Sequence, residues 1–442
     1  MNMSNVDTWR IAIVGGGITG LTLALGLIRR GVSVCIYEQA QNFREIGAGI
    51  GFTPNAERAM ELIDERIKVG FKRIATRNAS DWFQYVDGYH EKGADPRTSE
   101  EKLLFRIYLG ERGFEGCARS EFLDELVKLM DPGVVEFRKR LRSIHEMEGD
   151  GLRLEFEDGT MAEADAVIGC DGIRSRVRQL VVGEDNPASY PHYTHKYALR
   201  GLIPMTEAVA ALGEAKCATR FMHLGYNAHL LTFPVALGSL MNVVAFVSDP
   251  QEWPHEQMTS VASKQEAVEA FKDFGPTVRA VVGLLPDELS RWAVFDTYDN
   301  PVPSYAHGSI ALAGDAAHAS APHHGAGAGF GIEDALVLST LLGTELLSTL
   351  SNDDQEVVKL SKRDRLRAAF EVYDTVRRDR AQWLVESSRI IGEVYEWQHP
   401  ETGDDSEKCH HEAYWRSHRI WDYDVDDMVK KAEQMLLQRL RG

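Results

Sequence analysis

The chain has 442 residues, of which 44% are hydrophobic and 26% charged, a composition typical of globular proteins. Asp and Glu outnumber Lys and Arg by 67 to 49, giving a net charge of −18, which argues against nucleic acid and anionic membrane surfaces as partners. The five cysteines are scattered, and no apolar run reaches the roughly 18 residues needed to span a membrane. We therefore expect a cytoplasmic protein with no disulfide framework and no membrane segment.

The first motif is a glycine-rich turn near the start of the chain. It lies between an apolar strand expected over 11–14 and a helix expected over 21–30, and its glycines, at G-x-G-x-x-G spacing, are Gly15, Gly17 and Gly20. A second apolar strand over 32–37 ends at Glu38. In this order of elements the glycines let the backbone approach a pyrophosphate, and the carboxylate accepts hydrogen bonds from ribose hydroxyls. The pattern predicts a dinucleotide site.

A second strand running into a turn ends at Asp171 and Gly172. It continues into an Arg-rich helix expected over 173–180. This order is typical of a phosphate or ribose site, but it fits a surface helix with solvated arginines equally well. The motif alone leaves both interpretations open.

A third strand ends at Gly314 and Asp315. The glycine-rich loop 321–331 follows and leads into a helix expected over 332–350, with two carboxylates, Glu333 and Asp334, in its first turn. Repeated glycines at a helix N-terminus form an anion-binding nest. The nearby histidines lack metal-ligand spacing, so we expect no metal site here; they are His318, His323 and His324.

Two further stretches indicate ligand contact. The segment 44–51 begins with Arg44, which could reach a phosphate, and carries three alternating glycines, so its backbone could pass close to a flat ligand; a flexible loop is the alternative. Arg200 lies among apolar residues in a strand expected over 197–203. A buried arginine needs an anionic partner, which is either a protein carboxylate or an anionic ligand.

The remaining chain suggests a second sheet and a helical end. Strands are also expected over 228–235 and 242–247, with further strands and loops over 70–112. A long amphipathic helix is expected over 355–396, and residues 409–411 (Cys-His-His) are expected in a polar loop rather than in a ligand set.

Together, the three ordered motifs resemble the class A flavin-dependent aromatic hydroxylases of the p-hydroxybenzoate hydroxylase fold. The resemblance implies an α/β fold: a Rossmann-like FAD-binding domain, an inserted antiparallel-sheet substrate domain and a C-terminal helical region. The implied division is FAD-binding domain over 1–75, 113–190 and 299–350, substrate domain over 76–112 and 191–298, and C-terminal helices and tail over 351–442.

The resemblance also assigns roles by matching position. The ADP half of FAD would be held by Gly15, Gly17, Gly20 and Glu38, and its phosphate and ribitol region by Arg44 and Arg119. Asp171 with Gly172 would serve FAD and the transient nicotinamide nucleotide. Gly314 and Asp315 would bind the ribityl chain. The isoalloxazine ring would be lined by Pro322, Gly325, Gly327 and Ala328.

Four local stretches are similar to two fungal groups, the dearomatising monooxygenases of tropolone, sorbicillinoid and azaphilone pathways and the salicylate hydroxylases. They are residues 43–49, 200–203, 248–254 and 322–328. In the first group the arginine matching Arg200 holds the substrate phenolate. Some members carry a tyrosine where this chain has Phe233, and we expect Tyr108 to supply the missing hydroxyl. His323 or His324 is expected either to relay the phenol proton or to make a structural contact.

The implied activity is hydroxylation of a small phenolic substrate with FAD, O₂ and NADPH or NADH, through a C4a-hydroperoxyflavin. The outcome expected here is oxidative dearomatisation of a resorcylaldehyde-type polyketide in fungal secondary metabolism. Salicylate 1-hydroxylation to catechol is the alternative, and a non-catalytic FAD-fold binding protein is a third possibility from another class. We expect a monomer or a homodimer.

Overall fold

A six-stranded sheet carries the glycine-rich turn. Its strands, in spatial order, are β18 (Ala306–His307), β19 (Ile310–Leu312), β11 (Ala166–Gly169), β1 (Arg10–Val14), β2 (Ser33–Glu38) and β7 (Val135–Phe137). All pairs are parallel except the one made by β18. Parallel strands covered on both faces read as continuous apolar runs, and β11 is buried along its whole length. This is the Rossmann-like α/β sheet that the sequence predicts.

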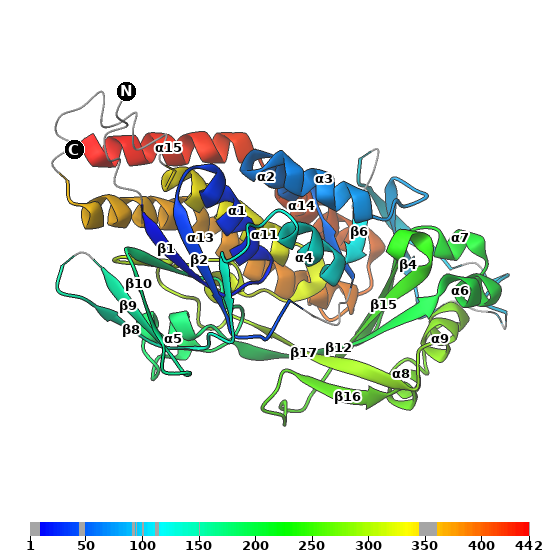
Figure 1. Ribbon diagram of the computed structural model, residues 1–442. Coiled ribbons are helices and arrows are strands. Elements are labelled where there is room, and N and C mark those ends of the chain that lie inside the picture. The colour runs from blue at the N-terminus through cyan, green and yellow to red at the C-terminus, as the bar shows by residue number, and fades with distance from the viewer. Residues whose placement is uncertain are drawn as a thin grey trace.

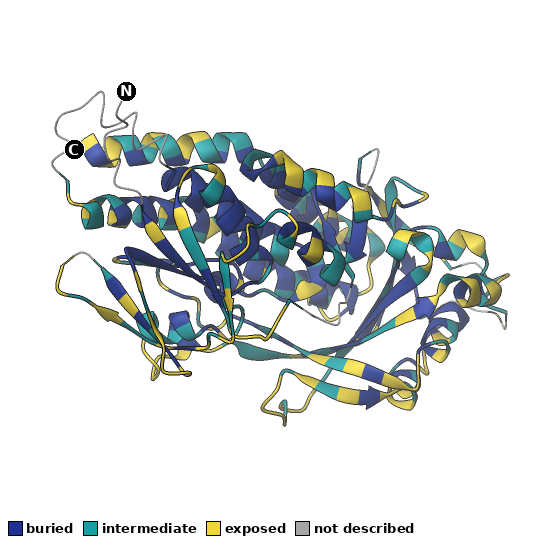
Figure 2. Ribbon diagram, in the orientation of Figure 1, coloured by how far each residue is buried: buried dark blue, intermediate teal, exposed yellow. Residues whose placement is uncertain are grey.

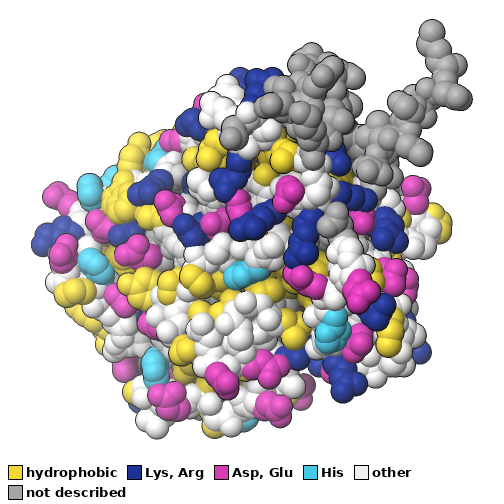
Figure 3. Space-filling view, turned by 90° about the vertical axis from the view of Figure 1, so that its left-hand side faces the viewer, with side chains coloured by type: hydrophobic (Ala, Val, Ile, Leu, Met, Phe, Trp, Pro, Cys, Tyr) yellow, Lys and Arg dark blue, Asp and Glu magenta, His cyan; other side chains and the backbone are white. Residues whose placement is uncertain are grey.

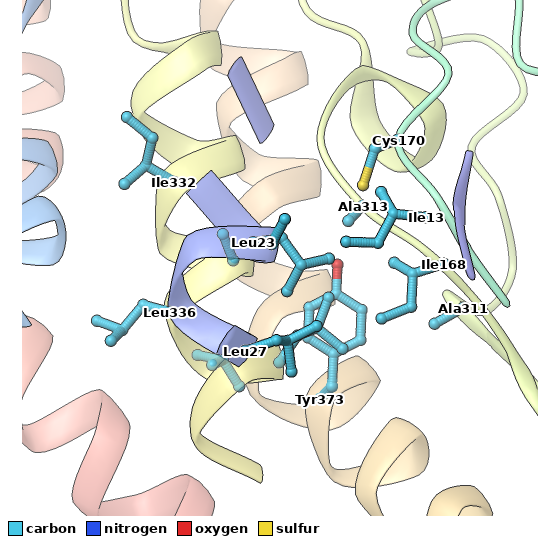
Figure 4. Packing of buried hydrophobic residues seen from close by; sticks show 14 of the residues in the cluster. Ile13, Leu23, Leu27, Ile168, Cys170, Ala311, Ala313, Ile332, Leu336 and Tyr373 are labelled. Carbon is cyan, nitrogen blue, oxygen red and sulfur yellow. The ribbon is translucent and has the colours of Figure 1, made fainter. Parts of the chain in front are cut away.

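In the computed structural model, helix α11 (Gly327–Leu341) packs against both α1 (Ile18–Arg29) and α13 (Lys362–Tyr395) beside this sheet (Figure 1). The core between helices and sheet is built from branched aliphatic side chains, with Leu23 of α1 and Ile13 of β1 close to the ring of Tyr373 (Figure 4). The buried Tyr373 hydroxyl donates to the carbonyl oxygen of Leu312 at 2.8 Å. The long helix α13 is thereby attached to the end of β19.

An eight-stranded sheet forms the second large unit. Its spatial order is β16 (Thr259–Ser263), β17 (Glu288–Asp296), β12 (His192–Pro204), β15 (Leu240–Ser248), β14 (Ala228–Val235), β13 (Phe221–Gly225), β4 (Trp82–Asp87) and β5 (Leu103–Tyr108). Only the pair of β13 with β4 is parallel. One face packs under a helical layer that consists of α6 (Met205–Leu212), α7 (Glu214–Cys217), α8 (Lys264–Ala270) and α9 (Pro276–Gly283). The other face packs against α13 and α14 (Ser406–Trp421) near β4 and β5, and it bears the site described below over β12, β15 and β14.

Shorter elements connect the two large sheets. The strands are β3 (Gly49–Phe52) paired with β6 (Glu115–Ala118), and β8 (Leu141–Glu146), β9 (Leu152–Phe156) and β10 (Met161–Ala164) in a small sheet. The helices are α2 (Pro54–Ile63), α3 (Glu65–Ile74), α4 (Arg119–Val127), α5 (Arg176–Val182), α10 (Asp315–His318), and the 3-10 turns η1 (Pro187–Ser189), η2 (Ala236–Gly238) and η3 (Pro322–His324).

Two sequence expectations about helices are wrong. The helix expected from residue 332 begins at Gly327, so the glycines form its first turn, and α11 is buried over nearly its whole length (Figure 2). Residues 409–411 lie in helix α14 (Ser406–Trp421), not in a loop, and α15 (Val425–Arg441) follows it. In α14 the period of buried residues was obscured by a charged and aromatic sequence.

The structure describes residues 9–43, 49–90, 93, 95–99, 101–110, 115–149, 151–343 and 360–441. Among these, no helix is long and apolar enough to cross a membrane, and no group of three or more His, Cys, Asp or Glu side chains is arranged to hold a metal ion. On the face shown in Figure 3, basic and acidic side chains are interspersed rather than gathered into areas of one sign.

Candidate functional site

The glycine-rich turn opens onto a cavity of about 730 Å³, which is within the range of small-molecule sites. Gly17 is the N-terminal cap of α1 and offers no side-chain partner to the first N–H groups of the helix. These N–H groups and the partial positive charge of the helix N-terminus are therefore open to an anion. Glu38 lines the same cavity, and its carboxylate accepts the backbone N–H groups of Gly16 at 2.6 Å and Ala40 at 2.7 Å.

Side chains are excluded from this turn by close packing. Gly15 has φ +106°, and a Cβ there would lie 2.3 Å from the carbonyl oxygen of Cys170. A Cβ on Gly20 would lie 2.0 Å from the carbonyl oxygen of Gly15. A Cβ on Gly17 would meet only Arg119, whose Nη2 lies 4.0 Å away. Gly15, Gly17, Glu38 and Arg119 thus line one cavity, with Gly20 packed against Gly15, and this cradle fits the ADP half of FAD.

Asp171 and Gly172 line the same cavity beside the glycine-rich turn. The Asp171 carboxylate accepts hydrogen bonds from Ser175 Oγ at 2.5 Å and from the Val177 N–H at 3.0 Å, while burial raises its pKa. The Arg-rich helix is not simply solvated, because Arg178 is fully buried. Its guanidinium donates to backbone carbonyls, including those of Ser189 at 3.1 Å and Ala316 at 3.0 Å. Sequence reasoning missed Arg178, since its spacing does not distinguish it from its exposed neighbours.

Asp315 connects the third motif to the first. Burial raises its pKa, while the charges of His318, Arg119 and Arg178 oppose that rise. A Cβ on Gly327 would lie 4.0 Å from Asp315 Oδ1, so the carboxylate sits beside the first turn of α11. Gly314 has φ +59° and leaves no room for a side chain, because Thr19 Oγ1 would be 2.5 Å away. These residues can bind the hydroxyls of a chain that runs from the phosphates toward α11.

A buried network of ion pairs fixes the turn at Gly314 and Asp315. Asp334 Oδ2 accepts the Gly314 N–H at 2.9 Å and a hydrogen bond from His318 Nε2 at 2.5 Å, and Asp334 Oδ1 accepts from Arg377 Nε at 2.7 Å. Burial alone would raise the pKa of Asp334, but His318 and Arg377 hold it far below its usual range. Glu333 joins the network through Arg377 and Arg380. These carboxylates sit in the middle of α11, so their partners are side chains rather than the N-terminus of the helix.

On the face of the eight-stranded sheet that bears Arg200, side chains from β12, β15 and β14 form three parallel rows. The register pairs Ala198 with Phe246 and His229, Arg200 with Val244 and Leu231, and Leu202 with Asn242 and Phe233. The first two rows meet Val294 of β17 and Ala321 of the glycine-rich loop in one hydrophobic cluster. The sequence motif after Gly314 therefore lies against the strand face of Arg200.

Arg200 is the cation at the centre of this face. Its Nε is buried without a hydrogen-bond partner, and its guanidinium lies 4.8 Å from the ring of Trp292. No carboxylate of the described residues forms an ion pair with it. Burial, and then the nearby charge of Arg119, lowers the pKa of Arg200 to about 10. At neutral pH it remains a cation, and a site with this arrangement is suited to an anionic ligand.

A second buried arginine lies beside Phe233, in the third row. Arg220 is 3% exposed, and burial lowers its pKa to about 9. Its guanidinium lies 5.1 Å from the ring of Phe83 and 5.9 Å from that of Phe233. Phe233 is seated where Gly49 and Gly116 leave room, because a Cβ on either would approach its ring within 3.1 Å. Sequence reasoning missed Arg220, which precedes a short strand that has no clear period.

Tyr108 does not share this site. It lies on the edge strand β5, five strands from β12, and it pairs with Trp82 on the face opposite Arg200. Its ring contacts Trp82 at a centroid distance of 5.2 Å, and 45% of the residue is exposed. The expectation that Tyr108 compensates for Phe233 is therefore wrong, because a one-residue alternation directs its side chain away from the substrate face.

The two histidines of the loop have different environments. His323 is buried against the rings of Phe246, at a centroid distance of 4.6 Å, and His229, at 5.3 Å. His324 Nε2 is hydrogen-bonded to Ser387 Oγ at 2.9 Å, and Ser387 also accepts from Arg416. Burial lowers the pKa of His324 to about 3, so it is neutral and serves as a contact to the C-terminal helices.

The other predicted residues surround the same loop or lie outside the described chain. Pro322 and Gly325 are exposed and Ala328 is half-buried. Arg44 lies outside the described residues.

Comparison with known proteins agrees with this arrangement. Residues 8–374 match the family model described as FAD binding domain. The chain is 58% identical over 443 residues to the FAD-dependent monooxygenase orf3 of Aspergillus niger, and the alignment covers 99% of each protein. It is 45% identical over 444 residues to the salicylate hydroxylase asL1 of Sarocladium schorii, and that alignment covers 98% of this chain and 92% of the relative. A solved salicylate hydroxylase substrate complex superposes with a TM-score of 0.82 at 32% identity, covering 97% of this chain and 98% of that one.

Proposed function

The chain belongs to the FAD-dependent aromatic monooxygenases of class A, and we propose that it hydroxylates a phenolic ring held as its phenolate by Arg200, with NADPH or NADH as reductant. The proposed outcome is oxidative dearomatisation of a resorcylaldehyde-type polyketide in fungal secondary metabolism. A ring carbon bearing an alkyl group cannot regain aromaticity by losing a proton, so its hydroxylation gives a dienone.

The observation that carries this proposal is the unpartnered Nε of Arg200 on an apolar face. A guanidinium buried beside Val244 and Trp292, without a described carboxylate, has its charge uncompensated until an anion binds. The nearby charge of Arg119 strengthens the positive potential at this point. A neutral phenol would gain less from this site than its phenolate, so binding favours ionisation of the ring hydroxyl.

When bound, FAD would supply the electrophilic oxygen for the proposed reaction. Arg200 orients the ring through its fork of N–H donors and stabilises the phenolate, which is far more electron-rich than the phenol. Val244, Phe246 and Leu231 present apolar side chains on the same face. A preorganised donor of this kind contributes about 2–4 kcal/mol to lowering the barrier.

Salicylate hydroxylation is the second candidate, and the similarity to asL1 and to the solved salicylate hydroxylase complex favours it. An aryl carboxylate would also satisfy Arg200, and loss of CO₂ from the hydroxylated carbon would restore the ring. The chain is 58% identical to orf3, an FAD-dependent monooxygenase, and 45% identical to asL1, so its similarity is not confined to salicylate hydroxylases.

The experiment supplies the FAD-loaded protein with NADH or NADPH and offers salicylate and a 2,4-dihydroxy-alkylbenzaldehyde in parallel, with products identified by mass spectrometry. Gain of one oxygen by the aldehyde and no reaction of salicylate would support dearomatisation. Catechol and CO₂ from salicylate would support the second candidate. Oxidation of the nicotinamide with only peroxide formed from both compounds would contradict both substrate classes.

A further inference from the structure

A buried polar cluster lies next to the row of Arg200 and has no part in the function proposed above. It joins strands β12, β14 and β15 to the C-terminal end of α13. Its members are Lys196, His229, Ser248, His323 and Glu396. Polar groups cost free energy when buried, so a cluster of this size beside an apolar pocket requires an explanation.

The hydrogen bonds define which ring nitrogen of His229 donates. Its Nδ1 lies 3.1 Å from Glu396 Oε1, while Glu396 Oε2 accepts from Ser248 Oγ at 2.6 Å and from Lys196 Nζ. Burial opposes ionisation of Glu396, but the hydrogen bond from His229 and the charge of Lys196 hold its pKa at about 2. An ionised carboxylate only accepts hydrogen bonds, so His229 must donate through Nδ1.

Two ring nitrogens in the cluster are left without partners. Burial lowers the pKa of His229, which favours the neutral ring, and in that form Nε2 carries a lone pair. This Nε2 is buried and has no hydrogen-bond partner, and the same is true of His323 Nδ1. The centroids of the two rings are 5.3 Å apart, so the two unpartnered nitrogens belong to neighbouring side chains.

The cluster is close to the site of the phenolate. His229 pairs with Phe246 and stacks on its ring at 4.5 Å, and Phe246 is two residues from Val244, the neighbour of Arg200. Two residues along a strand span about 7 Å. His229 therefore lies on the same face as Arg200, one row along and two strands across, with β15 between their strands.

We propose that the Glu396–His229 pair is the proton acceptor for the bound phenol, reached through a water molecule beside His323. The O–H bond of the phenol breaks and its electron pair stays on the oxygen, as a phenolate paired with Arg200. The proton is passed along the water and forms a new N–H bond at His229 Nε2. The resulting imidazolium is compensated by Glu396, and solvent takes the proton when product leaves. This inference rests on the proposed function.

The surrounding charges are compatible with this role. His229 faces Glu396 and Lys196, while His323 faces these residues and His324. Tyr395 lies against His229 at a ring distance of 5.5 Å. Lys196 balances the charge of Glu396 before the proton arrives, so Lys196, Glu396 and a neutral His229 together carry no net charge.

The test follows ionisation of a bound phenol without turnover. FAD-loaded protein is mixed by stopped flow with 2,4-dihydroxybenzaldehyde, at a pH below the pKa of the free compound and without nicotinamide, and the absorbance of the phenolate is recorded. In the wild type we expect a phenolate signal. In His229→Phe, which keeps a ring against Phe246, we expect the signal to form at least tenfold more slowly and to recover speed when imidazole is added.

The matched control is His223→Phe. His223 is a second buried histidine of the same sheet, hydrogen-bonded to Glu101 at 2.6 Å, but it lies in β13 on the opposite face from Arg200. Its phenolate signal should form at the wild-type rate. If His229→Phe does not retain FAD, the double variant Lys196→Met with Glu396→Gln removes the carboxylate without leaving an unpaired cation, and it should slow the signal to the same extent.

Two failures are distinguishable. A wild-type protein that binds the aldehyde without a phenolate signal would contradict the proposed function and with it this inference. A wild-type signal that forms equally fast in His229→Phe and in the double variant would overturn the inference alone. Slowing in His223→Phe of the same size would also overturn it, since the effect would then reflect general loosening of the sheet.

Discussion

Arg178 donates a hydrogen bond to the carbonyl oxygen of Ala316 at 3.0 Å, so a single buried side chain joins the turn after β11 to the turn after β19. The same guanidinium reaches Ser189 and the carbonyl of Asp315. Two motifs that are about 140 residues apart in the sequence are thereby held at one cavity.

Replacing Arg178 by Met should destabilise the protein and weaken FAD retention. The substitution leaves several buried carbonyls without a donor, each at a cost of about 1–3 kcal/mol before relaxation. We expect a loss of roughly 3–5 kcal/mol in the free energy of unfolding, measured by denaturant titration. Arg153→Met, at a half-exposed position of β9, should change stability by less than about 0.5 kcal/mol. Equal effects of the two variants would contradict the role of Arg178.

Arg200→Gln should retain FAD and lose most hydroxylation. Loss of about 2–4 kcal/mol of transition-state stabilisation corresponds to a decrease of roughly 30- to 1000-fold in kcat/KM. Arg200→Lys should also lose most activity, because an ammonium lacks the planar fork. Arg291→Gln serves as control, since Arg291 pairs with Leu199 on the opposite face of the sheet. Full activity in Arg200→Gln would exclude Arg200 as the phenolate partner.

Gly392→Ala should displace the histidine of the glycine-rich loop. A Cβ at Gly392 would lie 2.6 Å from His323 Cδ2, so the ring must move or α13 must shift. Overpacking of this kind costs about 1–3 kcal/mol. Gly283→Ala, at the last residue of α9 where a Cβ would meet nothing within 4 Å, should be neutral or stabilise by up to about 1 kcal/mol. Thermal unfolding of both variants measures the difference; equal Tm values would contradict the packing of His323 on Gly392.

The His324 imidazole should make stability depend on pH on the acid side. Its pKa is about 3 in the folded protein and about 6.5 in the unfolded chain. The unfolded chain therefore binds a proton first, so the full contribution of the neutral ring is present above pH 6.5 and is lost as pH falls from 6.5 toward 3. Each pKa unit corresponds to about 1.4 kcal/mol. In His324→Gln, which can keep the hydrogen bond to Ser387, the free energy of unfolding should fall less steeply between pH 6.5 and 4; an unchanged slope would contradict the prediction.

Much of the cofactor site could be predicted from the sequence, because its residues lie in short strand–turn–helix units with local rules. Gly15, Glu38, Asp171 and Asp315 all lie at or just after the end of a strand, and parallel strands bring such ends to one edge. The ion pairs of Asp334 could not be predicted in this way, since Arg377 comes from another helix 43 residues later.

The substrate face was harder to predict because side-chain direction depends on long-range register. Arg200 was recognisable from its apolar neighbours. In contrast, Arg220 and His229 can be placed on the substrate face only when the register of β12, β15 and β14 is known. The side-chain direction of Tyr108 was mispredicted for the same reason, since a shift of one residue in register moves a side chain to the other face of a sheet. The pairing of His229 with Glu396 also spans 167 residues, beyond any local pattern.

Helix α13 contacts both halves of the site through one uninterrupted run. Arg377 engages the ion network of α11, and Glu396, just past the end of the helix, engages the strand cluster, 19 residues and roughly 28 Å further along the axis. Inserting a single residue between them would rotate Glu396 by about 100° while leaving Arg377 in place. An insertion or deletion between Arg377 and Glu396 would thus break one of the two sets of contacts without changing any residue in either. We therefore expect chains of this fold to differ in length outside this part of α13.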